Sequence, residues 1–174
     1  MRLATPVIEG LAQHTGHTAA LALWGSHGPT IVRLAESPAA VHVNMRQGTV
    51  FSIAGTASGQ HYAAHLPEAL LRPLYEAERR SAGAARLPSC GQFAKTTLAE
   101  VRLQGLGRAD GSVVAGVSAL SAPVFDHRGE MVLALTVIGP SAALDTAWDS
   151  AAAQAMRNAA AAVSARLGYR SGGG

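Results

Sequence analysis

Two histidines at helical spacing are the first residues whose types could support chemistry. His61 and His65 are four residues apart, so on a helix they would share one face and could bind a metal ion. No third ligand is evident, because Glu68 follows Pro67, and the flanking residues do not form a His-Glu-x-x-His motif. We therefore interpret the histidines as a structural or solvated pair and predict no metal site.

Ser58 is a candidate nucleophile, because glycines flank it in the segment Gly55-Thr56-Ala57-Ser58-Gly59. The nucleophile turn of serine hydrolases has the spacing Gly-x-Ser-x-Gly and needs a base placed to take the serine proton. Here the serine is one position late. The sequence therefore predicts no enzymatic activity.

The same segment suits the binding of an anion. Residues 56–59 stand at the entrance to a predicted helix, where unpaired backbone N–H groups favour a carboxylate or phosphate and small side chains let the anion approach. Thr56 or Ser58 could instead cap the helix with a side-chain oxygen, with the segment packed under a loop. The residues alone leave both interpretations open.

The elements that must position these residues include one clear β-hairpin. Residues 113–125 and 130–138 are rich in strand-forming types, and the polar residues 126–129 connect them. With a period of two, mostly small side chains share one face of the hairpin: Ala115, Val117, Ala119, Ser121, Ala134, Thr136 and Ile138. Such a face either lets a helix pack closely or leaves room for a ligand.

The remaining hydrophobic periods and turn signals predict further elements. Helices are expected over residues 4–15, 60–66, 67–80, 92–104 and 144–167. Strands are expected over residues 17–24, 30–36, 41–45 and 106–108. Gly28-Pro29 and residues 109–111 are expected in turns, and Pro73 is expected to kink or divide its helix. The last helix should pack on the sheet through one stripe: Trp148, Ala152, Ala155, Ala159, Val163 and Leu167.

The composition fits a single cytoplasmic domain that does not itself bind DNA. The 174 residues are enough to bury a sizeable core, and no signal peptide or membrane span is evident. The net charge of +3 comes from scattered arginines, with Lys95 the only lysine and Arg79-Arg80 the only adjacent pair, so no basic stripe tracks phosphates. Cys90 is the only cysteine, which excludes an internal disulfide and fits a reducing compartment. In its Leu-Pro-Ser-Cys-Gly loop we expect a passive thiol.

The hairpin carries a family resemblance. Its GVSALSAPVFDHRG and LALTVIGP segments are similar to the signature of the C-terminal effector-binding domain of IclR-family transcriptional regulators. Other segments resemble the family pattern in the same order, over nearly the whole chain: ATPVIEGLAQHTGHTAALALW, IAGTASGQHYAAHL, LAEVRLQGLG and the final RLGY. The resemblance implies an α+β, GAF- and profilin-like fold with a curved antiparallel sheet of about six strands flanked by helices. Residues 1–170 would form the effector domain and 171–174 a disordered tail.

The resemblance also implies an effector site. Family members hold a small organic effector with backbone groups at the start of the central helix and with residues of the last two strands. The matching positions here are Ala57, Ser58, Gly59, Ala119, Thr136 and Ile138. Relatives that bind very small acids tend to have a cysteine and a serine where Ala119 and Ile138 stand. The resemblance therefore implies a less polar pocket and a more apolar or aromatic acid.

Four further positions complete the predicted pocket. Asp110 lies near an acidic residue of such relatives, although Asp-Gly is also an ordinary turn signal, and Ser112 stands where many members have glutamate. The pocket wall is predicted to include Trp24, Met45 and Phe51, although such side chains beside strands more often belong to a core.

The predicted function is effector sensing in transcription regulation. Relatives carry an N-terminal winged helix-turn-helix, whereas here Met1 is followed almost at once by the effector domain, so the chain is expected to be an excised domain or a truncated relative. DNA would be bound only through that missing domain, with the protein acting as a homodimer or homotetramer and without a cofactor. The alternatives are a GAF-like sensor or dimerisation module of a non-transcriptional protein and, less favoured, a small hydrolase.

Overall fold

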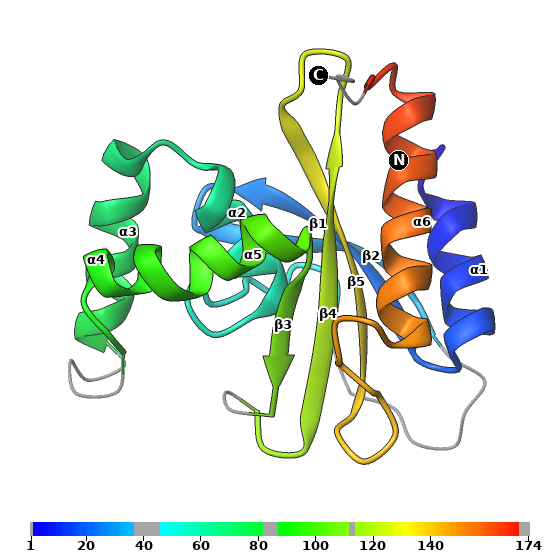
Figure 1. Cartoon of the computed structure of the whole chain (residues 1–174), viewed down its shortest axis with the longest axis horizontal. Coiled ribbons are helices and arrows are strands. Elements are labelled where there is room, and N and C mark those ends of the chain that lie inside the picture. Colours follow the sequence, from blue (N-terminus) through cyan, green and yellow to red (C-terminus); the bar gives the residue numbers. More distant parts are fainter. Residues whose placement is uncertain (1, 37–45, 82–86, 112–113, 171–174) are drawn as a thin grey trace.

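The computed structural model describes residues 2–36, 46–81, 87–111 and 114–170 of the chain. Its helices are α1 (Thr5–Thr15), α2 (Ala57–His65), α3 (Glu68–Ser81), α4 (Cys90–Phe93), α5 (Ala99–Gln104) and α6 (Ala151–Arg166), and a π-helical turn, η1 (Ala94–Leu98), joins α4 to α5 (Figure 1). Its strands are β1 (Thr18–Gly25), β2 (Gly28–Ala35), β3 (Gly107–Asp110), β4 (Val117–Phe125) and β5 (Met131–Pro140). No helix in these ranges is long and apolar enough to cross a membrane.

In the described part of the chain, five strands form one antiparallel sheet in the order β2-β1-β5-β4-β3. Two hairpins, β1-β2 and β4-β5, meet through the pairing of β1 with β5, which joins segments from near the two ends of the chain. The predicted α+β class is confirmed. The strand predicted over residues 41–45, with Met45, and the tail predicted over 171–174 lie outside the described residues.

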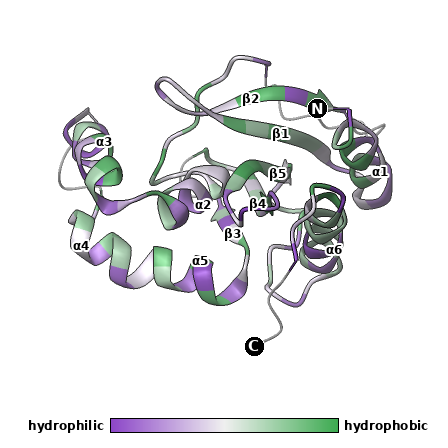
Figure 2. Cartoon of the chain, turned by 90° about the horizontal axis from the view of Figure 1, so that it is seen from above, coloured by the Kyte–Doolittle hydropathy of each residue, from purple (hydrophilic) through white to green (hydrophobic). Residues whose placement is uncertain are grey.

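The helices are divided between the two faces of the sheet. α1 and α6 lie side by side on one face, and α2 lies on the other (Figure 2). α3 and α4 lie beyond α2, away from α1 and α6, and the C-terminal end of α5 reaches α6, where Arg157 donates to the carbonyl of Gln104. Because side chains alternate along a strand, each central strand contributes residues to both layers.

The face under α1 and α6 carries the main hydrophobic core, and we call it the packed face. Its strand residues are large and fully buried, and helices α1 and α6 cover them with apolar side chains of their own. The main contributors are Ile8, Leu21, Leu120, Val124, Leu135, Val137 and Met156. Burying each such side chain stabilises the fold by about 1.5–3 kcal/mol.

Helix α6 begins seven residues later than predicted. Ser150 has extended backbone angles, and its Oγ accepts a hydrogen bond from the amide of Ala153 at 3.1 Å, so it caps the helix and leaves Trp148 in the preceding loop. The helix also turns a slightly different face inward. Its fully buried residues are Ala153, Met156, Ala160, Val163 and Ser164, whereas the predicted stripe is only partly buried apart from Val163.

The two hairpins differ from prediction only at their ends. β4 begins at Val117 rather than residue 113, directly after Gly116, whose φ of 78° falls in the left-handed region that ends an extended run. In the other hairpin Gly25 pairs with Gly28, so Gly28 and Pro29 belong to β2 and not to the turn. The turn is therefore only two residues long.

Three further elements correct the sequence predictions. α2 begins at Ala57 and not near residue 60, and Ala109 and Asp110 lie in β3 and not in a turn. α3 runs without a break through Pro73. Pro73 and Ala69, whose carbonyl loses its partner, are both exposed, so water can satisfy that carbonyl and the helix tolerates the proline.

Cys90 is the first residue of α4 and not part of a loop, because Ser89 caps this helix. The thiol is buried against the α3–α5 layer, and burial raises its pKa. A thiol that stays protonated is a poor nucleophile, in agreement with the passive role predicted for it.

Candidate functional site

The start of α2 is capped by its own chain. Thr56 has extended angles, and its Oγ1 accepts a hydrogen bond from the amide of Gly59 at 3.1 Å while donating one to the carbonyl of Ser52 at 2.7 Å. The capping interpretation therefore holds for Thr56. The amides of Ala57 and Ser58 belong to the first helical turn, where the helix itself provides no acceptor.

Strand pairing arranges the sheet beneath α2 in two parallel rows that cross four strands. One row, which we call the inner row, consists of Ala20, Thr136, Ser121 and Gly107. The next, the outer row, lies two residues further along each strand and consists of Thr18, Ile138, Ala119 and Ala109. Residues two apart on a strand share a face, so both rows face α2.

Helix α2 sits directly on the inner row. The Oγ atom of Ser58 lies 2.6 Å from Oγ1 of Thr136, which donates a hydrogen bond to Oγ of Ser121 at 3.2 Å. Ser121 in turn donates to the carbonyl of Leu135 at 2.9 Å. Because Thr136 gives its proton to Ser121, Ser58 must donate to Thr136. These three buried hydroxyl groups thus form one ordered chain between helix and sheet.

The outer row lies beyond the N-terminal end of α2. Ser58 stands over the inner row, and the hydroxyl of Tyr62, one turn later, donates to the carbonyl of Ala22 at 2.9 Å. Along β1, Ala22 and Thr18 lie on opposite sides of Ala20, so the helix runs away from the outer row. The positive end of its dipole therefore faces that row.

The side chains of the outer row are small or apolar. Thr18 and Ile138 are buried, whereas Ala109 and Ala119 are only partly buried. The structure thus brings five of the predicted residues together at one end of α2: Ala57, Ser58, Ala119, Thr136 and Ile138.

Gly59 serves the packing of the chain itself. A Cβ at this position would overlap the backbone of Ser52 and Ile53, so only glycine lets the helix start lie against the segment before it. Gly107 has a similar role, because a Cβ there would overlap the carbonyl of Ala57. The short distance between α2 and β3 depends on it.

The predicted pocket wall lies elsewhere. Trp24 and Phe51 pack around Tyr62, and the rings of Trp24 and Tyr62 have centroids 5.4 Å apart. Tyr62 belongs to the second half of α2, so these aromatic side chains stand one turn or more from the helix start. Met45 is not among the described residues.

Asp110 is not brought to this site. It pairs with Ser118, whereas its neighbour Ala109 pairs with Ala119 of the outer row. The alternation of the strand therefore turns Asp110 toward the side of Arg108, whose guanidinium carbon lies 4.3 Å from the ring centroid of Trp148.

His61, which the sequence led us to interpret as one of a structural or solvated pair, is a buried member of the α2 layer. Its Nε2 lies 2.8 Å from the carbonyl of Ser121, and since a carbonyl can only accept, Nε2 carries the proton. Nδ1 is then the only buried side-chain polar atom without a partner among the residues described. Burial lowers the pKa of His61 to about 3, so the imidazole is neutral.

His65 is also held by a backbone carbonyl. Its Nδ1 donates to the carbonyl of His61 at 2.8 Å, its ring stacks on that of His61, and burial lowers its pKa. Within the described ranges no three His, Cys, Asp or Glu side chains gather as metal ligands would. Hydrogen bonds to the carbonyl of Ser121 in β4 and of His61 in α2 therefore account for the positions of the two rings.

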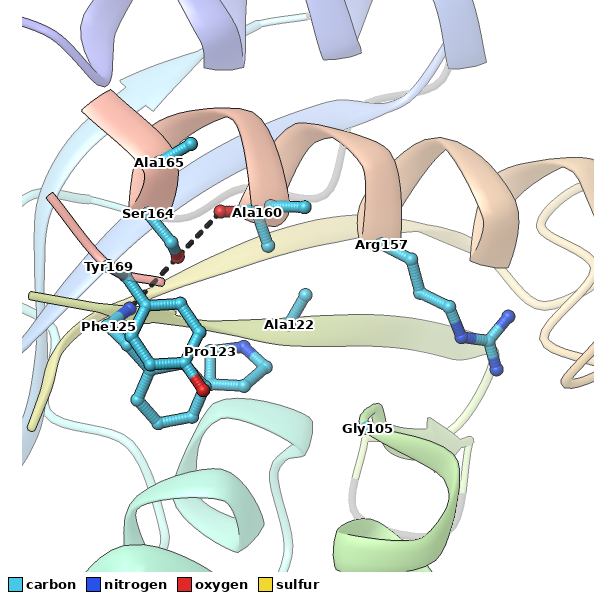
Figure 3. A pocket seen from close by; sticks show the side chains of 10 residues that line it. Gly105, Ala122, Pro123, Phe125, Arg157, Ala160, Ser164, Ala165 and Tyr169 are labelled. Carbon is cyan, nitrogen blue, oxygen red and sulfur yellow. Dashed lines mark hydrogen bonds between the residues drawn. The ribbon is translucent and has the colours of Figure 1, made fainter. Parts of the chain in front are cut away.

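A cavity of about 410 Å³ lies away from this site, at the edge of the sheet between α6 and the end of β4 (Figure 3). Ser164 accepts a hydrogen bond from the amide of Phe125 at 3.0 Å and donates to Ala160, so the strand edge is closed at this point. Arg157, the only charged residue in its lining, already donates to the carbonyls of Gln104 and Trp148. We therefore assign this cavity no binding role.

Comparisons with known proteins agree on one family. The family model of the bacterial transcriptional regulator IclR C-terminal region matches residues 1–165. Among solved structures, the chain is similar to HmgR of Pseudomonas aeruginosa, with 33% identity and a TM-score of 0.89 over 98% of this chain and 68% of HmgR. It is also similar to a separately solved domain of an IclR-family regulator, with 26% identity and a TM-score of 0.82 over 98% of each chain.

A more distant likeness supports the fold alone. IclR of Thermotoga maritima is 19% identical, with a TM-score of 0.79 over 97% of this chain and 68% of that protein. No curated protein sequence matches the chain.

Proposed function

Because this chain belongs to the IclR family of bacterial transcriptional regulators, as the C-terminal part that senses the effector, we propose that it binds a small organic acid between the start of α2 and the outer row. The family and the solved relatives are transcriptional regulators and not enzymes. The direction of α2 carries the proposal, since its positive N-terminal end faces a row of small or apolar side chains.

The carboxylate of the effector would accept hydrogen bonds from the amides of Ala57 and Ser58. These groups lie in the first turn of α2, and an anion is favoured there by both the free donors and the helix dipole. The rest of the effector would lie over Ala119 and Ile138, which offer no hydrogen-bond partner from their side chains. An apolar or aromatic body suits this surface better than a very small polar acid.

The effector would act by changing the arrangement of attached DNA-binding domains. DNA recognition would belong to a winged helix-turn-helix outside this sequence, in a homodimer or homotetramer. A ligand shifts such an equilibrium only by its different affinity for the two arrangements. The proposed site is suited to such a shift, because helix α2 forms one of its walls and the central sheet forms the other.

A melting screen against carboxylic acids tests the proposal. The purified chain is heated with straight-chain acids from acetate to octanoate and with benzoate, phenylacetate and phenylpropionate. A ligand at 100 times its Kd stabilises the native state by about 2.7 kcal/mol, which gives a clear rise in Tm. We expect a saturable rise with the aromatic or longer acids and little with their primary amides, which lack the charge.

A blocking variant locates the site. Ala119→Phe fills the outer row without removing the hydroxyl chain of Ser58 and Thr136, and it should abolish the rise in Tm. Ala162→Phe, on the exposed side of α6, is the control and should retain the rise. No rise with any acid, or an equal rise in both variants, would contradict the proposal and favour a dimerisation role.

A further inference from the structure

We propose that Glu78 of α3 is a positioning residue for the effector site, because its carboxylate fixes the segment that leads into α2. The inference rests on the function proposed above and names the group that holds the binding site in shape. Glu78 is separated from the start of α2 by more than twenty residues of sequence, and it does not belong to the site itself.

The carboxylate of Glu78 is bound by three donors from one short stretch of chain. Its Oε2 accepts from the amide of Ile53 at 2.7 Å, and its Oε1 accepts from the amide of Ala54 at 3.2 Å and from the hydroxyl of Ser52. Hydrogen bonds to an ionised group are stronger than those between neutral groups. Two successive amides and one hydroxyl group therefore hold this segment against α3.

Ser52 passes this restraint on to the helix start. Its Oγ accepts from the amide of Gly55 at 2.8 Å, and its carbonyl accepts from the hydroxyl of Thr56 at 2.7 Å. Thr56 is the residue that caps α2 through the amide of Gly59. A continuous series of hydrogen bonds thus runs from Glu78 to the first turn of α2, where the proposed effector carboxylate binds.

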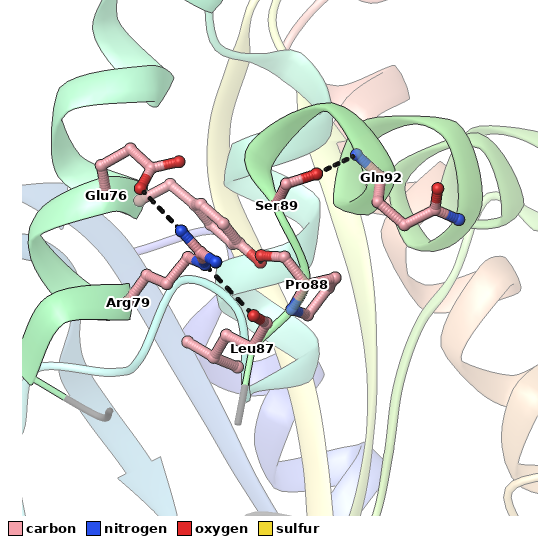
Figure 4. A network of polar contacts seen from close by, with 7 residues as sticks. Glu76, Arg79, Leu87, Pro88, Ser89 and Gln92 are labelled. Atoms are coloured by element: carbon pink, nitrogen blue, oxygen red, sulfur yellow. Dashed lines mark hydrogen bonds and ion pairs between the residues drawn. The ribbon is translucent and has the colours of Figure 1, made fainter. Parts of the chain in front are cut away.

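Helix α3 is itself held by the segment that leads into α4, and this keeps Glu78 in place. On another side of this helix, Arg79 donates to the carbonyl of Leu87 at 3.2 Å and pairs with Glu76 at 3.5 Å (Figure 4). The hydroxyl of Tyr75 donates to the carbonyl of Pro88 at 3.0 Å, next to Ser89, which caps α4. These contacts tie α3 to the α4 end of the layer.

Hydrogen bonds from the chain, and not a cation, satisfy the Glu78 carboxylate. Within the described residues no Lys, Arg or His lies within ion-pair distance of it, and Arg79 next to it is turned to Glu76 and Leu87. The amides of Ile53 and Ala54 are thereby already occupied by an internal anion. An effector acid is left with the amides that follow, at the first turn of α2.

Hydrogen exchange of the effector-free chain tests the positioning directly. Glu78→Gln replaces the carboxylate with an amide, whose NH₂ group would face the three donors of residues 52–54. Ser52→Ala removes the hydroxyl group that joins Glu78 to the amide of Gly55, without changing any charge. In both variants the amides of residues 53–59 should exchange about tenfold faster, while those of the central sheet are unchanged. Glu68→Gln, an exposed carboxylate at the start of the same helix, is the control and should exchange like the wild type.

Calorimetric titration with phenylacetate then measures the consequence for binding. Affinity should fall about tenfold in Glu78→Gln and in Ser52→Ala, since each loses hydrogen bonds of a charged group. Glu68→Gln should bind like the wild type. A higher affinity in Glu78→Gln would mean that the residue acts only by charge repulsion and would overturn the inference.

The two readouts separate this inference from the proposed function. Unchanged exchange in both variants would overturn the role of Glu78 whatever the chain binds. If the wild type binds neither phenylacetate nor octanoate, the proposed function fails and the role of Glu78 in ligand binding falls with it. Faster exchange would in that case show that Glu78 holds the helix start for packing alone.

Discussion

The two faces of the central sheet are built from different kinds of residue. Toward α1 and α6 the strands present Leu21, Leu120, Leu135 and Val137, which are fully buried and form the main core. Toward α2 the same strands present mostly alanine, serine and threonine, with Ile138 in the outer row, and their contacts with the helix include hydrogen bonds from Ser58, His61 and Tyr62.

Because of this difference, each strand serves stability with one face and the proposed effector binding with the other. A strand residue and its neighbour serve different layers, so the packed face can be filled with large side chains while the α2 face keeps small ones. A close-packed apolar layer tolerates little change, whereas a layer held by a few hydrogen bonds can rearrange when a ligand competes for them. Variants on the two faces test that separation.

Loss of a large side chain from the packed face should have the greatest effect on stability. Leu135→Ala leaves a cavity in the fully buried core and should lower the free energy of unfolding by about 4 kcal/mol. Denaturant unfolding measures the change. The control is Leu103→Ala on α5, where the side chain is 81% exposed and the loss should stay below about 0.5 kcal/mol. Equal effects would contradict the assignment of the core.

Acid should weaken the α2 face through His61. Burial lowers the pKa of this residue from 6.5 to about 3, so between these values the unfolded chain binds a proton that the folded chain does not. The stability that neutral His61 provides is therefore present at neutral pH and is lost as the pH falls through this range. The loss is about 1.4 kcal/mol per pH unit, or about 2–3 kcal/mol at pH 4.5.

Comparison with a neutral side chain isolates this effect. His61→Gln keeps an N–H donor for the carbonyl of Ser121 but cannot titrate, so its unfolding free energy should fall less between pH 7 and pH 4.5 than that of the wild type. His27→Gln, at an exposed turn, should keep the wild-type pH dependence. Parallel curves for the wild type and His61→Gln would show that His61 takes up its proton in the folded state.

The hydroxyl chain under α2 should give the smallest effect. Thr136→Val keeps the shape but leaves the hydroxyl of Ser58 without an acceptor, which should cost about 1–2 kcal/mol of unfolding free energy. The double variant Ser58→Ala with Thr136→Val removes both partners and should cost less than the sum of the single changes. Strict additivity would mean that the two hydroxyl groups do not interact.

Local patterns predicted the fold well and its boundaries less well. The β4-β5 hairpin was evident because alternation and the polar connection are properties of adjacent residues. The start of α6 was misplaced because Leu144 and Trp148 continue the apolar pattern of the helix, whereas the cap at Ser150 is one residue of a common type. Asp110 was assigned to a turn from its Asp-Gly pair, but pairing with Ser118 keeps it in β3.

Local patterns predicted even less of how the residues of the candidate site come together. The helix start and the face carrying Ala119 and Thr136 could be predicted, since each depends on neighbouring residues and on the resemblance of these segments to one family. The grouping of Trp24 and Phe51 with Tyr62 could not, because it depends on which turn of α2 lies over which strand. Nor could the partner of Glu78, which lies twenty-five residues away at Ile53.

The sequence by itself determined the α+β class, the small-residue segment that leads into the central helix and the small side chains of one strand face, because periodicity and turn chemistry act over a few residues. Tertiary structure alone decided that α2 runs away from the outer row, that Ser58 meets Thr136 and that a carboxylate from α3 holds the segment before the cap. Those contacts join residues 24 to 78 positions apart, and only the packing of the helices on the sheet brings such residues within hydrogen-bond distance.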